Sequence, residues 1–267
     1  MKIIQWNAKS LAAHGSEFSK YISDLSSKPD IICIQETWLK CHNHFRIPGY
    51  TLIRRDRECG SGGGFVKIDV PFIETDCNVQ LECNIIKLPS TREVVTIVNF
   101  YNPCRPLINN ILQWVLCKCE GVILLCGDLN SLNYLWGSKL TDRNSECIIS
   151  IIDDLTWCFY MMVLGLLSIH LLKKMGMARQ RPLEYWRKVD AVTRWSGACS
   201  HTWPDLIWWT WQISPLDLTF VSTSAAARCE WTVSSDSMGS AHFQVITCLK
   251  WDRSPLWNFS KANWDSF

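Results

Sequence analysis

Four apolar, strand-like segments of this 267-residue chain end in polar residues that could bind a metal ion or a phosphate. In chain order these residues are Asn7, Glu36, Tyr101 with Asn102, and Asp128 with Asn130. In open α/β sheets, ligands gather at the carboxyl ends of strands, so side chains far apart in sequence can converge there. Carboxylate and amide oxygens in such a cluster are suitable ligands for a hard divalent cation.

Each motif is weak when taken alone. A glutamate after a buried strand is often a solvated strand end, and Gly-Asp-Leu-Asn at 127–130 could be an ordinary turn, since Asp and Asn favour turns. His242 stands at the start of a strand-like run and could equally be a core histidine with its hydrogen bonds satisfied. The order of the motifs along the chain carries more weight, because Leu-Asp-Leu-Thr at 216–219 and Ser-Ala-His at 240–242 follow the first four.

The elements that would position these residues alternate between strands and helices. Apolar runs predict strands at residues 2–7, 31–36, 50–54, 66–68, 81–88, 94–100 and 122–126, with strand patterning again at 215–221. Helical spacing of apolar residues predicts helices at 17–26, 107–116 and 145–155. This alternation indicates an α/β fold with buried sheets.

Composition indicates a globular, intracellular protein. Hydrophobic residues make up 48% and charged residues 19%, and the net charge of +2 neither requires nor excludes a nucleic-acid partner. Of the fourteen cysteines, Cys33, Cys126 and Cys248 lie inside apolar runs, which favours reduced thiols over a disulfide framework. The pattern of Met1 to Asn7 predicts a short strand rather than a signal peptide. The apolar stretch 157–172 is too short for a spanning helix and contains His170, so no membrane partner is expected.

The order of the motifs resembles the endonuclease/exonuclease/phosphatase superfamily, to which DNase I and the abasic-site nucleases belong. Several segments are similar to the endonuclease domain of jockey-type non-LTR retrotransposons. They are Gln-Trp-Asn-Ala-Lys-Ser-Leu at 5–11, Gln-Glu-Thr-Trp-Leu at 35–39, Ile-Pro-Gly-Tyr at 47–50, Arg-Arg-Asp-Arg at 54–57, Asn-Phe-Tyr-Asn-Pro at 99–103 and Leu-Trp-Gly-Ser at 135–138. The resemblance is dense from Met1 to about Asp154 and resumes from Leu216 to about Cys248.

The resemblance implies a DNase I-like fold, an α/β sandwich of four layers in which two packed mixed β-sheets are flanked by helices. The domain would span residues 1–250, followed by a C-terminal tail or the start of a linker at 251–267. Residues 156–214 lose all periodicity and are crowded with tryptophan. They are either an unusual aromatic insertion or an out-of-frame segment, and the second interpretation is favoured.

The implied function is a metal-dependent DNA endonuclease that hydrolyses phosphodiester bonds to nick target DNA. Glu36 would bind Mg²⁺, with Mn²⁺ as an alternative, and Asn7 would support that site. Asp128 would orient and deprotonate the attacking water, and Asn130 would hold Asp128 or the phosphate. DNA is the expected partner, and a reverse transcriptase is expected in cis in the intact element. Activity would require access to the nucleus, although no basic targeting run is present.

The remaining implied roles concern the phosphate. Tyr101 would donate its hydroxyl to the phosphate, and Asn102 would bind the substrate. His242 would stabilise the phosphoryl oxygens, with Asp217 holding its imidazole in orientation.

This chain departs from the family pattern at two positions. The family's Ser-Asp-His is Ser-Ala-His here, so Ala241 replaces a carboxylate of the catalytic cluster, and Leu132 stands where the family has a histidine. The loss of the carboxylate at Ala241 suggests that this copy is impaired. The alternatives are therefore a catalytically dead DNA-binding relic, a phosphatase or phosphodiesterase on the same fold, or a translated pseudogene without function.

Overall fold

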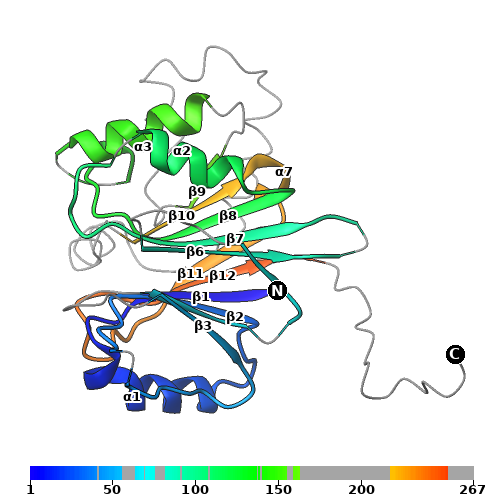
Figure 1. The fold of residues 1–267 in the computed structure, drawn as a ribbon, viewed down its shortest axis with the longest axis vertical. Helices are drawn as coiled ribbons and strands as arrows, with labels where there is room; N and C mark the ends of the chain where they lie inside the picture. The colour runs from blue at the N-terminus through cyan, green and yellow to red at the C-terminus, as the bar shows by residue number, and fades with distance from the viewer. Residues whose placement is uncertain are drawn as a thin grey trace, which may run out of the picture.

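Two β-sheets pack face to face, with helices on their outer surfaces, in the computed structural model of the chain (Figure 1). The structure describes residues 1–40, 42–55, 64–68, 70–75, 82–90, 92–107, 109–136, 138, 140–154, 159–162 and 217–251. The predicted α/β sandwich of four layers, with two mixed sheets, is confirmed. No helix among the described residues is both long and apolar enough to cross a membrane.

The first sheet has the strand order β11-β12-β1-β2-β4-β3. Its strands are β1 (Lys2–Asn7), β2 (Ile31–Gln35), β3 (Thr51–Arg55), β4 (Gly64–Ile68), β11 (Cys229–Val233) and β12 (Val245–Leu249). The central pair, β1 and β2, is parallel, and the other pairings are antiparallel.

The second sheet has the order β5-β6-β7-β8-β10-β9. Its strands are β5 (Ile73–Thr75), β6 (Glu82–Leu88), β7 (Val95–Tyr101), β8 (Val122–Asp128), β9 (Phe159–Met162) and β10 (Asp217–Ser222). Here the central β7 and β8 are parallel. Each sheet therefore has one parallel pair whose two carboxyl ends lie at the same edge.

The helices cover the two outer faces. Helix α1 (Leu11–Asp24) lies against the first sheet, where Phe18 stacks on Trp6 with ring centroids 4.7 Å apart. Helices α2 (Asn109–Cys117) and α3 (Arg143–Asp154) cover the second sheet. The single 3₁₀ turn η1 (Tyr134–Trp136) and the short α7 (Thr223–Ala226) complete the described elements.

The core is divided by strand periodicity into three apolar clusters. Alternate strand residues such as Ile3 and Leu124 face the space between the sheets, while their neighbours face a helix. The sequence therefore encodes both faces of each central strand as apolar, as expected for sheets buried on both sides.

Two local expectations need correction. Helix α1 begins at Leu11, six residues before the predicted start, because the Ser10 hydroxyl caps it by accepting from the Ala13 N–H. Cys33 and Cys126 are buried free thiols as expected, but Cys248 is exposed. Cys248 lies on the outer face of β12, where it pairs in register with Lys2 of β1 on one side and with Glu230 of β11 on the other. Its neighbours on this face are therefore polar.

Most of the segment predicted to be discordant, 156–214, lies outside the described residues, as does nearly all of the proposed tail at 251–267. The apolar stretch 157–172 is described only at Phe159–Met162. These four residues form β9, which pairs with β10 at the edge of the second sheet.

Candidate active site

Strand register brings the sequence-predicted carboxylates to one edge of the sandwich. In the second sheet Asp128, the last residue of β8, pairs with Tyr101 on one side and with Asp217, the first residue of β10, on the other. Side chains of residues paired in register project from the same face of a sheet. Tyr101, Asp128 and Asp217 therefore all face the first sheet, where β1 ends at Asn7 beside the end of β2.

Asn7 joins the carboxylates of the two sheets. Its side-chain Nδ2 donates to Glu36 Oε1 at 2.8 Å and to Asp128 Oδ2 at 2.7 Å. Its Oδ1 accepts from the Lys9 backbone N–H at 3.1 Å, which fixes the amide orientation. Asn7 is fully buried, so these bonds hold Glu36 and Asp128 at a defined separation.

Asp128 is a buried carboxylate with an unusual proton affinity. Burial and the neighbouring negative charge of Asp217 raise its pKa to about 7, against the opposing effects of His242, the Asn130 N–H and the Asn7 amide. The Asn130 N–H donates to Asp128 Oδ1 at 3.0 Å, so each carboxylate oxygen has a donor. A group with such a pKa can exchange a proton near neutral pH.

The backbone before Asp128 requires glycine. Gly127 has φ of +154°, and a Cβ at this position would lie 1.7 Å from the Phe100 carbonyl oxygen on β7. The close approach of β7 and β8 at this point is what places Tyr101 opposite Asp128.

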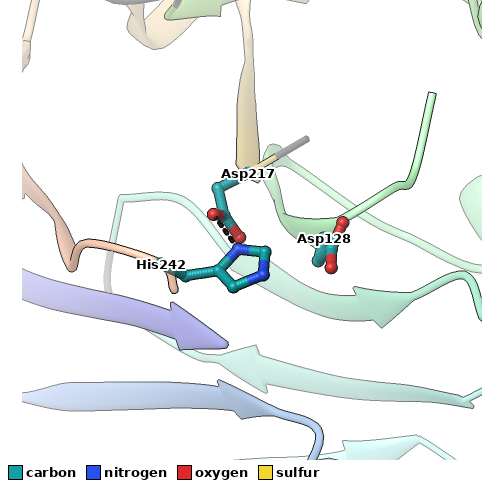
Figure 2. Close-up of side chains that lie close together, drawn as sticks. All are labelled: Asp128, Asp217 and His242. Carbon is teal, nitrogen blue, oxygen red and sulfur yellow. Dashed lines mark hydrogen bonds and ion pairs between the residues drawn. The ribbon is translucent and has the colours of Figure 1, made fainter. Parts of the chain in front are cut away.

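Asp217 and His242 form a buried pair beside Asp128 (Figure 2). His242 Nδ1 lies 2.6 Å from Asp217 Oδ2, and the opposite side of the imidazole ring is turned toward Asp128. Hydrogen bonding and charge interaction with Asp217 raise the pKa of His242 in spite of its burial, and burial raises the pKa of Asp217. One ligand atom from each of Asp128, Asp217 and His242 falls within 4.8 Å of the others, which is close enough for a shared metal ion.

The loop that carries His242 is anchored on the first strand. The Ser240 hydroxyl donates to the Asn7 carbonyl at 2.7 Å and accepts from the His242 N–H at 3.2 Å. The Trp6 indole N–H donates to the His242 carbonyl at 3.1 Å. Ala241 is exposed between these two anchored residues, and Asp236 cannot substitute for the missing carboxylate because its Oδ1 accepts from the Met238 N–H in an exposed turn.

Tyr101 lies against Glu36. Its hydroxyl interacts with the Glu36 carboxylate, and burial together with that charge holds the tyrosine pKa far above its ordinary value. Tyr101 therefore stays protonated at any working pH and remains a hydrogen-bond donor.

Asn102 and Asn130 connect the loops after β7 and β8. The Asn102 amide nitrogen donates to the carbonyls of Arg105 and Leu129, and its Oδ1 accepts from the Arg105 N–H. The Asn130 side chain donates to the Asn102 carbonyl at 2.7 Å. Both amides thus hold loops in this arrangement, and the predicted contact of Asn102 with substrate stays a prediction.

Backbone strain is concentrated at this edge. Among the described residues, seven that are not glycine have a positive φ, and all but one of them lie in the loops that follow β1, β2, β7 and β8. They are Lys9, Ser10, Glu36, Trp38, Cys104, Asn130 and Met238. Such conformations each cost on the order of 1–3 kcal/mol and collect where function requires a particular geometry. The strain at Glu36 is offset by its carbonyl, which accepts from the Ser10 N–H at 2.8 Å.

Sequence reasoning did not identify a buried polar layer directly beneath the site. Gln5 and Gln35 from the first sheet bond Thr219 and Asn99 of the second sheet, respectively. The signal was present, because both glutamines interrupt otherwise apolar strand runs at positions that face the other sheet.

The sequence and the fold match a known family. The model of the Endonuclease/Exonuclease/phosphatase family matches residues 4–242, and the chain belongs to this family. No curated protein matches the chain.

Solved structures share the fold at low sequence identity. The endonuclease domain of TRAS1, a telomere-specific non-LTR retrotransposon, aligns with a TM-score of 0.61 and 16% identity over 94% of this chain and 99% of its own. An AP endonuclease from Archaeoglobus fulgidus aligns with a TM-score of 0.59 and 13% identity over 94% of this chain and 100% of its own. A 3' phosphatase from Neisseria bound to a product DNA hairpin aligns with a TM-score of 0.55 and 14% identity over 94% of this chain and 100% of its own.

Proposed function

We propose that this chain is the metal-dependent DNA endonuclease domain of a non-LTR retrotransposon and that it nicks target DNA by phosphodiester hydrolysis, with reduced activity in this copy. The observation that carries the proposal is the convergence of Glu36, Asn7, Asp128 and the Asp217–His242 pair at one edge of the sandwich. The likeness to the TRAS1 endonuclease domain supports DNA as substrate. A reverse transcriptase in cis and activity in the nucleus are part of the same proposal.

The residues fit a hard divalent cation. Asp128 and Asp217 are two buried carboxylates, and burial together with the negative charge of Asp217 raises the pKa of Asp128 to about 7. A divalent cation would offset this uncompensated negative charge, and oxygen ligands suit Mg²⁺ or Mn²⁺. When bound, the cation supplies charge neutralisation at the phosphoryl oxygens. Glu36 would hold it, and Asn7 would support that site through its hydrogen bond to the Glu36 carboxylate.

One group of the protein accounts for the proton transfer from the attacking water. Asp128 accepts a proton from the attacking water as the water oxygen forms its bond to phosphorus and the bond to the leaving sugar oxygen breaks. The leaving oxygen takes up a proton from solvent. Asn7 keeps Asp128 aligned, and the N–H of Asn130 holds its second oxygen.

Two donors stabilise the phosphate. His242, whose pKa Asp217 raises in spite of its burial, stabilises a phosphoryl oxygen. Tyr101 keeps its proton and donates its hydroxyl to the phosphate. The absence of a carboxylate at Ala241 reduces the charge available to hold a cation, which is the reason we propose impaired rather than full activity.

The test is nicking of supercoiled plasmid by the purified chain in Mg²⁺ or EDTA. We expect slow nicking in Mg²⁺ that EDTA and Asp128→Ala both abolish and that Asp24→Ala, at an exposed residue of α1, leaves unchanged. Nicking only in Ala241→Asp would indicate an intact fold with a disabled site. DNA binding without nicking, both in the wild type and in Ala241→Asp, would instead identify a catalytically dead DNA-binding relic. Release of phosphate from a 3'-phosphorylated strand, with no nicking, would favour the phosphatase.

A further inference from the structure

Beneath the site, an unused donor of the buried polar layer and an unused acceptor of Asp217 lie on neighbouring residues of the two sheets. Gln5 is 2% exposed, and its Oε1 accepts from the Thr219 hydroxyl at 3.0 Å across the space between the sheets. Its Nε2 is buried and has no hydrogen-bond partner, and neither does Asp217 Oδ1. An unpaired buried polar atom is unfavourable by about 1–3 kcal/mol, so two such atoms of opposite type within reach have a strong tendency to bond.

Strand geometry places these two atoms at adjacent positions. Asp217 and Thr219 are two residues apart on β10, so both side chains project from the same face toward the first sheet. The carbonyl end of the Gln5 amide is held by Thr219, which directs the amino end toward the neighbouring carboxylate. The Gln5 amide is near enough to lower the pKa of Asp217.

Asp217 has two oxygens with different tasks. Its Oδ2 contacts His242 Nδ1 at 2.6 Å, whereas Oδ1 is buried with no other described partner. A carboxylate held at only one oxygen can rotate about its side-chain bonds and carry the imidazole with it. A donor at Oδ1 would prevent this rotation.

We propose that Gln5 is a positioning residue that holds Asp217 through Oδ1 and thereby fixes the imidazole of His242 toward Asp128. Thr219 sets the orientation of the Gln5 amide, so β1 of one sheet controls the histidine pair built on the other. The inference rests on the proposed function for its effect on catalysis, but the arrangement itself is measurable without DNA or metal.

The chain offers a matched control in Gln35. It lies beside Asn7 in register, is fully buried, and donates its Nε2 between the sheets to Asn99 Oδ1 rather than toward Asp217. Gln5→Met and Gln35→Met each remove one buried amide and keep the side-chain volume. A general loosening of the sandwich would therefore affect both variants alike.

The first readout is the Nδ1 proton of His242 in the NMR spectrum of the metal-free chain, identified by its loss in His242→Asn. We expect Gln5→Met to shift this resonance and to speed its exchange with water, while Gln35→Met leaves it in place. Thr219→Val should move it in the same direction by a smaller amount, and this variant decides the question if Gln5→Met does not fold. An unchanged resonance, or an equal change in Gln35→Met, would overturn the proposal.

The second readout is the rate of nicking. We expect Gln5→Met to lower kcat by about ten- to a hundred-fold with little change in KM, as is usual when a group that orients a catalytic residue is removed. A shifted His242 resonance with no nicking in any variant would refute the nuclease and leave the positioning role supported. Wild-type kcat in Gln5→Met, together with an unmoved resonance, would refute the positioning role alone.

Discussion

Replacing Asp128 by Asn should make the metal-free protein more stable at pH 8 while abolishing its nuclease activity. The Asp128 carboxyl is 1% exposed, and its pKa is raised from 3.8 to about 7 by burial and by the charge of Asp217. The folded chain therefore binds more protons than the unfolded chain between these two values. Asp128 therefore does not reduce the free energy of unfolding below about pH 4, and it lowers that free energy progressively as the pH rises to about 7.

The magnitude follows from the two pKa values. A rise from 3.8 to about 7 corresponds to on the order of 4 kcal/mol of destabilisation once Asp128 is ionised. Asparagine cannot ionise and escapes this penalty, but its amide nitrogen would face the Asn7 Nδ2 that now donates to Asp128 Oδ2. That unmatched donor pair costs about 1–3 kcal/mol. The net gain at pH 8 is therefore on the order of 2 kcal/mol.

The assay is chemical denaturation in EDTA at several pH values between 4 and 8. The stability difference between Asp128→Asn and wild type should grow with pH over this range, and Asp24→Asn should show no such trend. Mg²⁺ should then stabilise the wild type more than the variant, because it binds the ionised site. A variant that is less stable than wild type at pH 8, or a difference that does not depend on pH, would refute the account of Asp128.

Three further changes test other parts of the site. Gly127→Ala should destabilise the fold by more than about 3 kcal/mol in thermal denaturation, because its Cβ would collide with a backbone oxygen of β7. Gly49→Ala, with φ of +84° and no atom within 4 Å of the added Cβ, should cost only about 1 kcal/mol, and equal losses would contradict this reasoning. Asp217→Asn removes the charge that raises the pKa of His242. The fall of the nicking rate at high pH should therefore begin at a lower pH in this variant. An unchanged pH profile would show that protonated His242 is not required for nicking. Ala241→Asp should tighten Mg²⁺ binding by about ten-fold or more in calorimetry, whereas unchanged affinity would show that this position does not reach the cation.

Much of the arrangement could be predicted without coordinates. The strands that end at Asn7, Gln35 and Asp128 were evident because burial on both faces requires a continuous apolar run, and the polar residue that stops the run is a local feature. The start of α1 was missed because its cap depends on Ser10 in a left-handed conformation, which the apolar spacing does not reveal. The interpretation of residues 156–214 as a discordant segment stays a prediction, because only the strand β9 within it is described.

The joining of these parts is a tertiary property. Asp217 and His242 are 25 residues apart, and they meet only because β10 pairs with β8 in one sheet while the loop before β12 is tied to β1 in the other. The same holds for Gln5 and Gln35, whose links reach 214 and 64 residues along the chain. Residue type, strand periodicity and turn chemistry act over a few neighbouring residues, so they can be read locally. Register and sheet packing are decided by all strands together, and they alone set which polar side chains share a hydrogen bond and how far the pKa of Asp128 rises.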